Sequence, residues 1–459
     1  MSARLTDSQM YGHLWGTPET RAIFAEDARL QCWLDILIAL AQAQSELGYI
    51  PSGAADAIRE HARVERLDLH AVAHETRRTG HSTLGLIRVL RDTLPDVARE
   101  HVYYGATVQD VTDTWTALVF KQVGALVWRD LRAVEQRLLE LAVAHRDTVM
   151  AGRTHGQVGA PITFGWKVAS WADEVRRHVD RLRSGADRWL VGQLGGAVGT
   201  AAFFGAHALE LRRRFCALLD LGDPGISWLA ARDRVAEFGA LLALIAGTLA
   251  RMGNEIYALA RTEIGEVREA TDPAAVSSIT MPHKRNPERA EHLVTLARLV
   301  TAQAHVLLEG AVHEHERDGR AWKAEWVALP EICLLTGTAL TLARDMLEDL
   351  DVDVARMARN VATHHDHLAS ERLLAALTGR TGKHEAQRIL QDALAAARAS
   401  GAPVTRALSD STAVRAHLSD DELQAVLAAG PDAGAAGDMV DLVVARARAA
   451  RSAEPVRWP

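Results

Sequence analysis

Residues 236–260, AEFGALLALIAGTLARMGNEIYALA, decide the fold class of this chain. Drawn as a helix, the stretch has apolar residues on almost every side, which a helix at a protein surface does not tolerate in water. Its most apolar part, from Phe238 to Ala250, is bounded by Glu237 and Arg251, which argues against a membrane span. We therefore expect a helix inside a bundle that several subunits build, and no membrane partner.

The sequence on either side predicts more helices. An early stretch has apolar residues at three- and four-residue steps until Gly48 and Pro51 stop the pattern: Leu30, Trp33, Leu34, Leu37, Leu40 and Ala41. From Asp110 the pattern is that of very long helices, and one stripe holds Leu131, Val134, Leu138 and Leu141, with Glu135 and Glu140 off it. Long helices of this kind pack as a bundle, so the predicted fold class is all-α.

Breaks in the pattern divide the chain into three helical domains. We predict an N-terminal domain over residues 1–109, a central long-helix bundle over 110–352 with a catalytic loop at about 265–287, and a small C-terminal domain over 353–459. Glycine and proline punctuate the last of these. The Ala- and Gly-rich tail from Gly430 is expected to be loosely ordered.

Composition excludes several classes of function. The chain has 459 residues and a net charge of -7, which argues against a general nucleic-acid binder because such proteins need a positive face. The N-terminus lacks the apolar core of a signal peptide, so we expect a soluble, cytoplasmic protein. Cys32, Cys216 and Cys333 are far apart and lack metal-ligand spacing, so neither a metal site nor a disulfide framework is predicted.

The stretch from Ser277 to Pro287, SSITMPHKRNP, carries the predicted chemistry. Its groups suit the removal of a proton from a carbon next to a carboxylate, where the carbanion puts two negative charges on that carboxylate. Ser278 would be the base, as an alkoxide in a dry, donor-rich loop. Lys284 and Asn286 would stabilise the charge, together with the amides of a helix that begins after Pro287. In a different interpretation the serines cap that helix and Lys284 is a surface charge.

This stretch resembles the signature loop of the aspartase/fumarase superfamily, Gly-Ser-Ser-x-Met-Pro-x-Lys-x-Asn-Pro. Ile279 stands where that loop has its second serine, so a register with one inserted residue would make Ser277 the base in place of Ser278. Both assignments stay open. In the gapless register Ser277 would contribute to substrate binding instead.

Residues 152–157, GRTHGQ, are similar to the Gly-Arg-Thr-His-x-Gln segment of the same superfamily. The resemblance implies that Thr154 and Gln157 bind substrate and that His155 is catalytic and pairs with Glu291. A carboxylate beside the imidazole would orient it and raise its pKa.

Residues 104–110, YGATVQD, are similar to the superfamily's Gly-Ala-Thr-Ser-x-Asp segment. The resemblance implies that Thr107 binds a substrate carboxylate, although Val108 replaces the second hydroxyl. Asp110 is more simply explained as the N-cap of the following helix. Over nearly the whole chain, the resemblance implies a homotetramer with each active site shared among three subunits, a small dicarboxylate substrate, and no cofactor or metal.

Two branches of the superfamily come near this chain. Adenylosuccinate lyase has Ser-Ser-Ala-Glu-Arg for a phosphate where residues 322–326 read WKAEW, and a tryptophan in place of the arginine removes a bidentate anion contact. Residues 315–318 look more like the 3-carboxy-cis,cis-muconate cycloisomerase branch, and Arg317 is a candidate to hold a carboxylate. Residues 79–81 resemble the Thr-x-His segment of nitrogen-eliminating lyases, so His81 is either catalytic or a helix-terminus residue.

A small substrate fits these departures best. We predict a carbon–nitrogen lyase that releases fumarate from a succinate with a compact nitrogen substituent, of the nitrosuccinate or aminosuccinate type. One alternative is a lactone-forming cycloisomerase. The other is a catalytically silent structural homologue, which the intact set of Ser278, Lys284, Asn286 and His155 disfavours.

Overall fold

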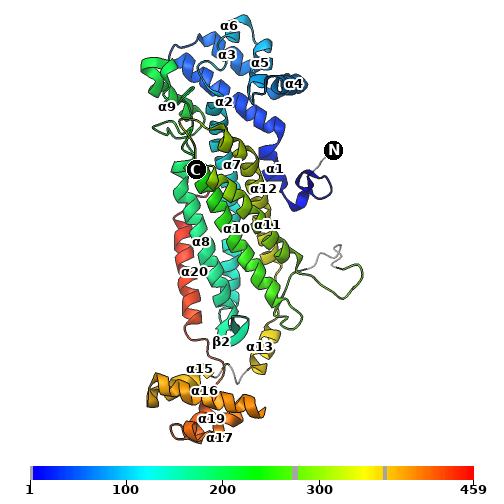
Figure 1. The fold of residues 1–459 in the computed structure, drawn as a ribbon, viewed down its shortest axis with the longest axis vertical. Coiled ribbons are helices and arrows are strands. Elements are labelled where there is room, and N and C mark those ends of the chain that lie inside the picture. Colours follow the sequence, from blue (N-terminus) through cyan, green and yellow to red (C-terminus); the bar gives the residue numbers. More distant parts are fainter. Residues whose placement is uncertain (1–3, 271–277, 365–367, 369, 459) are drawn as a thin grey trace.

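Long helices dominate the molecule, which is a computed structural model that describes residues 4–270, 278–364, 368 and 370–458 (Figure 1). Within those residues the strands form two sheets of two strands each. The predicted all-α class is therefore confirmed.

Shorter helices and one long one form the N-terminal part: α1 (Pro18–Phe24), α2 (Glu26–Glu46), α3 (Ser52–His61), α4 (Leu69–Thr79), α5 (Leu84–Thr93) and α6 (Asp96–Arg99). The stripe predicted from Leu30 to Ala41 is the buried face of α2. Local chemistry sets the helix ends. In α4, Asp68 accepts hydrogen bonds from the first free amides, and Gly80 ends the helix with a φ of 64°.

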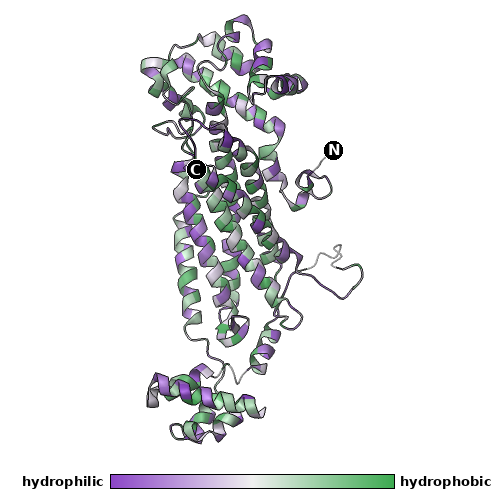
Figure 2. Ribbon diagram, viewed as in Figure 1, coloured by the Kyte–Doolittle hydropathy of each residue, from purple (hydrophilic) through white to green (hydrophobic). Residues whose placement is uncertain are grey.

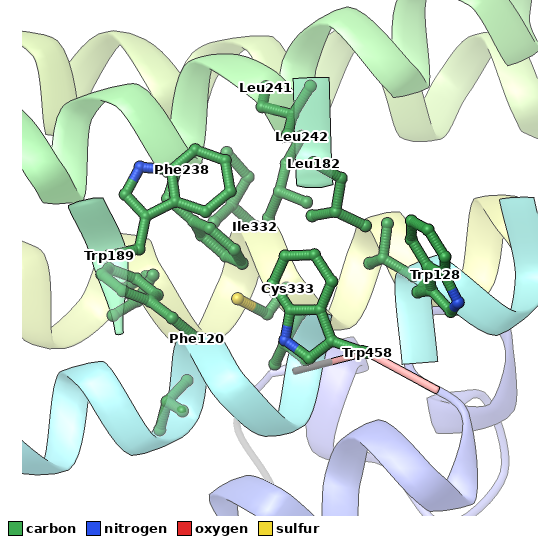
Figure 3. Close-up of a cluster of buried hydrophobic side chains, with 14 of the residues drawn as sticks. Phe120, Trp128, Leu182, Trp189, Phe238, Leu241, Leu242, Ile332, Cys333 and Trp458 are labelled. Carbon is green, nitrogen blue, oxygen red and sulfur yellow. The ribbon is translucent and has the colours of Figure 1, made fainter. Parts of the chain in front are cut away.

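The central bundle is built from α7 (Val108–Ala144), α8 (Phe164–Trp189), α10 (Asp233–Leu259), α11 (Glu288–Glu309) and α12 (Gly319–Glu348). α9 (Ala208–Leu218) lies against α2. In the bundle core, Phe120 stacks on Phe238 with ring centroids 4.3 Å apart, and Trp189 meets Phe238 edge-on (Figure 3). Hydrophobic residues are concentrated along these bundle helices (Figure 2).

Two bundle helices, α10 and α12, are long and apolar enough to cross a membrane by length and composition alone. In each, 67% of the most apolar window is buried inside the structure. Burial of that kind is what the core helices of a soluble bundle show, and α10 is the helix expected from residues 236–260.

Glu135 departs from the predicted pattern. We expected it off the apolar stripe of α7, and it is nevertheless fully buried. The reason is that α8 and the last helix, α20 (Ala436–Ser452), cover that side of α7. Arg451 donates a hydrogen bond to its carboxylate at 2.6 Å, and Arg176 lies 3.4 Å from it.

The ordered α20 also corrects the expectation of a loose tail. Its Ala and Val residues pack on α8, and beyond it the Trp458 ring lies 6.1 Å from that of Trp128. A side chain at Gly124 would strike Trp458 at 2.8 Å. Small residues therefore let the tail approach the bundle closely.

The end of the bundle opposite the N-terminal helices holds both sheets and the C-terminal helices (Figure 1). The antiparallel pairs are β1 (Val149–Thr154) with β2 (Gln157–Thr163) and β3 (Val267–Arg268) with β4 (Asp351–Val352). The helices are α13 (Val354–Thr363), α15 (Ser370–Thr381), α16 (Lys383–Ser400), α17 (Val404–Asp410), α18 (Thr412–Arg415) and α19 (Asp420–Ala428). Leucines of α15 to α19 form a separate hydrophobic cluster.

Candidate active site

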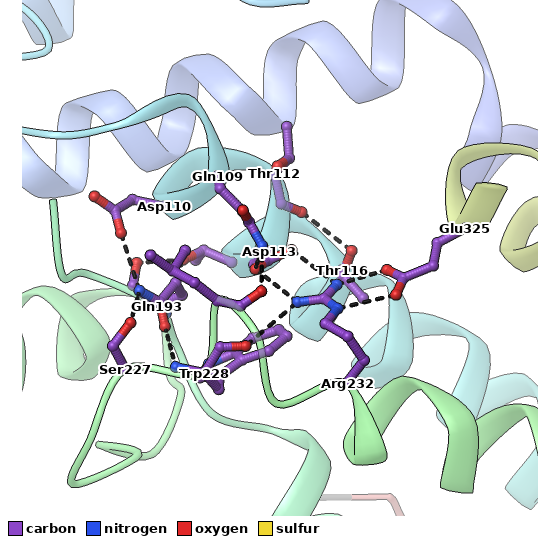
Figure 4. Close-up of polar contacts among 12 residues, drawn as sticks. Gln109, Asp110, Thr112, Asp113, Thr116, Gln193, Ser227, Trp228, Arg232 and Glu325 are labelled. Atoms are coloured by element: carbon purple, nitrogen blue, oxygen red, sulfur yellow. Dashed lines mark hydrogen bonds and ion pairs between the residues drawn. The ribbon is translucent and has the colours of Figure 1, made fainter. Parts of the chain in front are cut away.

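Asp110 fixes the entry to α7. Its carboxylate accepts hydrogen bonds from the backbone amides of Thr107, Gly195 and Gly196 and from Gln193 Nε2, all between 2.8 and 3.0 Å (Figure 4). Burial raises the pKa of Asp110 to about 6, against the lowering effect of these hydrogen bonds. Thr107 is the N-cap residue of α7, so Asp110 is not the N-cap that we expected. It lies three residues later, where its carboxylate completes a capping box, and it also holds the glycine-containing turn against the helix.

Thr107 and Arg317, two predicted substrate-binding residues, are in contact. Arg317 Nη1 donates a hydrogen bond to the Thr107 hydroxyl at 2.8 Å, although 210 residues separate them in sequence. The Arg317 guanidinium also lies over the Trp322 ring, 5.6 Å from its centroid. A cation and a hydroxyl held together in this way can bind a carboxylate.

A buried ion triad links the helices at the end of the bundle where α7 begins. The sequence analysis did not predict it. Arg232 is 2.8 Å from Asp113 and 2.5 Å from Glu325, and all three side chains are nearly inaccessible (Figure 4). Burial raises the pKa of Asp113, while Arg232 opposes that shift. The three residues join α7, the start of α10 and α12. They lie far apart in the sequence, so no local sequence motif predicts the triad.

His81 lies at the start of α5. Its Nδ1 accepts a hydrogen bond from the Leu84 amide at 3.3 Å, and the ring is exposed. A neutral imidazole that accepts at Nδ1 carries its proton on Nε2. The residue therefore occupies a helix terminus and at the same time presents a donor to solvent.

The β1–β2 hairpin carries the predicted residues Thr154, His155 and Gln157. His155 and Gly156 form its two-residue turn with φ values of 52° and 76°, the left-handed geometry that tight hairpins need. All three predicted residues are exposed at the tip. The turn presents the imidazole beyond the end of the bundle.

Arg153 anchors this hairpin to the base of the predicted catalytic loop. Its guanidinium donates two hydrogen bonds to Glu266, at 2.8 and 2.9 Å, and the Glu266 side chain is fully buried. Asn360 of α13 donates a third, at 2.8 Å. Glu266 thus ties the hairpin, the loop base and α13 together.

The start of α11 differs from the prediction. We expected its free amides to face the substrate anion, but the carboxylate of Glu269 accepts from the amides of Arg289 and Ala290 at 3.1 and 2.8 Å. A carboxylate of the same chain therefore satisfies the helix N-terminus. Burial raises the pKa of Glu269, and the two amides oppose that rise.

The loop residues before α11 are open to solvent. The Ser278 hydroxyl accepts a hydrogen bond from the Met281 amide at 3.0 Å and is half-buried, while Lys284 is exposed. Asn286 and Arg285 line a depression of about 390 Å³ next to Glu269. Ser277 lies outside the described residues.

Glu291 is exposed in the first turn of α11. Among the described residues of a single chain, no hydrogen bond or ion pair joins it to His155. The pairing that the resemblance implies is therefore not made within this protomer.

One chain cannot gather all the predicted groups. Thr107 precedes α7, whose 37 residues span about 55 Å, and the hairpin follows its far end. Arg317 likewise precedes α12, while the loop base lies near the other end of that helix, where Arg289 donates to the Asp345 carbonyl at 3.0 Å. Figure 1 shows the hairpin and the N-terminal end of α7 at opposite ends of the bundle.

Comparison with known proteins gives the family. A family model described as "Lyase" matches residues 15–302. The chain is 38% identical to N-acetyl-S-(2-succino)cysteine lyase of Dickeya dadantii over 97% of this chain and 98% of the relative. It is 37% identical to adenylosuccinate lyase of Methanothermobacter thermautotrophicus over 94% of this chain and 96% of that protein.

A solved structure agrees with these likenesses. The 3-carboxy-cis,cis-muconate lactonizing enzyme of Pseudomonas putida superposes with a TM-score of 0.87 at 34% identity, covering 96% of this chain and 99% of that one. The superfamily and the two neighbouring branches expected from the motifs are confirmed. The chain belongs to the lyase family of the fumarase/aspartase superfamily.

Proposed function

We propose that this lyase releases fumarate from a succinate that carries a sulfur-linked substituent at C2. The observation that carries the proposal is the 38% identity, along 97% of the chain, to a lyase named for N-acetyl-S-(2-succino)cysteine. The nitrogen-linked substrates predicted from the sequence, of the nitrosuccinate or aminosuccinate type, need the same proton abstraction and differ in the departing atom.

In the proposed reaction Ser278, or Ser277 in the other register, removes a proton from C3. The electron pair moves onto the adjacent carboxylate as an aci-carboxylate, which Lys284 and Asn286 stabilise. The pair then forms the C2–C3 double bond as the C2–S bond breaks. The sulfur leaves with its electrons as a thiolate, which accepts a hydrogen bond from His81 Nε2. The serine then returns its proton to solvent and the thiolate takes one from solvent, which gives fumarate and a thiol.

The other predicted residues bind the substrate. Thr107 and Arg317 would hold one carboxylate, and their 2.8 Å contact supports that role. Thr154 and Gln157 would bind from the hairpin tip, beside His155 paired with Glu291 of another subunit. Carboxylate binding from two sides would fix C3 near the base.

We further propose a homotetramer with each site shared among three subunits. The separation of the predicted groups along α7 and α12 supports this, because no single chain brings them together. Exposed large apolar residues on bundle helices fit a surface that other subunits cover: Leu244, Leu299, Leu308 and Val327.

One assay tests the proposed function. Purified protein is incubated separately with N-acetyl-S-(2-succino)cysteine, nitrosuccinate, aspartate and 3-carboxy-cis,cis-muconate, and products are measured by mass spectrometry. We expect fumarate and thiol in equal amounts from the first. Fumarate from a nitrogen compound alone would replace sulfur by nitrogen as the departing atom. Lactone without fumarate would establish the cycloisomerase, the second candidate, which the 34% identity to the lactonizing enzyme over 96% of this chain supports.

A further inference from the structure

A cavity of about 260 Å³ lies between α2, α7 and α12, and the reaction proposed above leaves it without a role. We call it the tryptophan pocket, because most of its wall is apolar and comes from Trp33, Trp115, Trp322, Trp326 and Leu329. Among the described residues that line it, Arg29 of α2 is the only cation and Glu325 of α12 is the only anion. These two charges decide what the pocket can bind.

Glu325 does not neutralise Arg29. Both carboxylate oxygens of Glu325 accept hydrogen bonds from Arg232, at 2.9 and 2.5 Å (Figure 4). The Glu325 carboxylate is therefore already paired with a guanidinium that does not line the pocket. The cation that lines the pocket is left without an anion of its own.

The terminal nitrogens of Arg29 are accessible. The side chain is half-buried, and its guanidinium lies over the Trp33 ring, 5.9 Å from the centroid. Within the described part of the chain its nitrogens have no hydrogen-bond or ion-pair partner, and of the three only Nε is fully buried. A cation set in an apolar wall costs free energy unless an anion pairs with it. The two terminal nitrogens can form such a pair without any change in the wall.

Trp322 connects the tryptophan pocket to the proposed carboxylate site. The Arg317 guanidinium, which bonds Thr107 at 2.8 Å, lies over the Trp322 ring at 5.6 Å. One turn further along α12, Trp326 meets Trp322 edge-on at 4.8 Å. A succinate held by Thr107 and Arg317 would therefore extend its C2 substituent along these rings into the pocket.

The opposite side of the pocket leads to the residue proposed to contact the departing sulfur. Ser82 lines the pocket and follows His81 directly in the chain. The volume of the pocket is below the roughly 300–1,000 Å³ of sites for drug-sized ligands, so it suits a short chain and not a nucleotide. The departing group is thus the part of the substrate that the pocket can receive.

We infer that Arg29 binds a third anionic group of the substrate, carried by the departing group in addition to the two carboxylates of the succinate. The guanidinium offers paired N–H groups to two anionic oxygens, and the tryptophan rings contact the short chain that leads to them. This inference rests on the proposed elimination. It adds Arg29 as the residue that determines the charge of the departing group, whether the departing atom is sulfur or nitrogen.

The test uses two compounds of the same size that differ in one charge. They are S-(2-succino)-3-mercaptopropionate and its terminal amide, S-(2-succino)-3-mercaptopropionamide, and fumarate release is measured for each. We expect the native enzyme to favour the acid over the amide about tenfold in kcat/KM, because a hydrogen bond between two charged groups is stronger than one to an amide.

Variants of Arg29 assign that preference. Arg29→Met keeps much of the length and removes the charge, so it should lower kcat/KM for the acid, leave the amide unchanged and bring the ratio near one. Arg29→Gln is a second neutral variant with the same expectation, should Arg29→Met not fold. Arg91→Met is the matched control, since Arg91 is exposed on α5 and lines a different surface depression. It should keep the native ratio.

Calorimetry with the same two compounds separates this inference from the proposed elimination. If neither compound releases fumarate, the elimination fails for them. Tighter binding of the acid, lost in the neutral Arg29 variants and kept in Arg91→Met, then still supports the anion site at Arg29. Equal treatment of acid and amide by the native protein in both measurements, no binding of either, or a preference that the neutral Arg29 variants leave unchanged would overturn the inference.

Discussion

At the scale of single residues, Ser278 is the group on which the proposed chemistry depends most. Its hydroxyl accepts from the Met281 amide at 3.0 Å, and a donor of this kind helps to stabilise an alkoxide. We expect Ser278→Ala to lower kcat by about 10²- to 10⁴-fold with little change in KM, because a base acts on the proton transfer and not on binding.

Two other loop variants are needed to interpret the result for Ser278→Ala. Thr280→Ala serves as the control, since Thr280 lies in the same exposed segment and has no proposed role. Ser277→Ala distinguishes the two registers. If it loses kcat as strongly as predicted for Ser278→Ala, while Ser278→Ala remains active, the base is Ser277.

Asp110 gives a prediction for stability against pH. Its pKa is raised to about 6, above the usual value of 3.8, so the native protein binds a proton between these values that the unfolded chain has released. The stabilising effect of that proton is present below about pH 4 and is lost as pH rises through 6. Urea denaturation of native protein and Asp110→Asn should show the native protein losing about 3 kcal/mol relative to the variant across this window. A constant difference between the two would contradict the raised pKa.

Some residue positions could be read from the sequence and others could not. Thr107 and Arg317 were each chosen from motifs, and the structure brings them into contact. The Asp113–Arg232–Glu325 triad was invisible, because its members pair across three helices and share no local spacing. The burial of Glu135 was not predicted, because it depends on α8 and the distant α20, which cover that side of α7.

At the scale of elements, Glu269 controls how α11 begins. It occupies two free amides of the first turn, so Glu269→Ala should destabilise the protein by about 1 kcal/mol. The measurement is the free energy of unfolding in urea at neutral pH. Glu288→Ala is the matched control: it removes an exposed carboxylate from the same first turn without a capping bond. An equal loss in both variants would mean that charge near the helix dipole, and not capping, stabilises the turn.

A helix could be predicted where its own residues carry the pattern, and could not be predicted where it depends on packing against a distant part of the chain. α2 and α10 carry their own apolar pattern, so their residues alone predict them. The β1–β2 hairpin was not predicted. Its turn at His155-Gly156 is a signal of only two residues, in a chain whose pattern is otherwise helical. α20 was missed because its Ala-rich sequence becomes a helix through packing on α8, a contact that no local pattern contains.

At the scale of the whole molecule, the division into three domains over residues 1–109, 110–352 and 353–459 stays a proposal, and α20 does not fit the last of them because it packs on α7 and α8 of the bundle. The C-terminal helices have a hydrophobic cluster of their own, between Leu373 and Leu427. α20 then returns to the bundle. This return path would hold the small C-terminal helices close to the hairpin that carries His155.

The proposed sharing of sites predicts that two inactive variants restore each other. Arg317→Ala and His155→Ala remove groups at opposite ends of the bundle, about 55 Å apart along the 37 residues of α7, so they belong to different sites of any one chain. If equal amounts are dissociated, mixed and reassembled, a site takes its intact Arg317 from one subunit and its intact His155 from another. Each choice has even odds, so about a quarter of the sites are native and fumarate release should recover to about a quarter of the native rate. Each variant reassembled alone is the control. No recovery from the mixture, with tetramers shown by light scattering, would mean that the two residues do not serve one shared site.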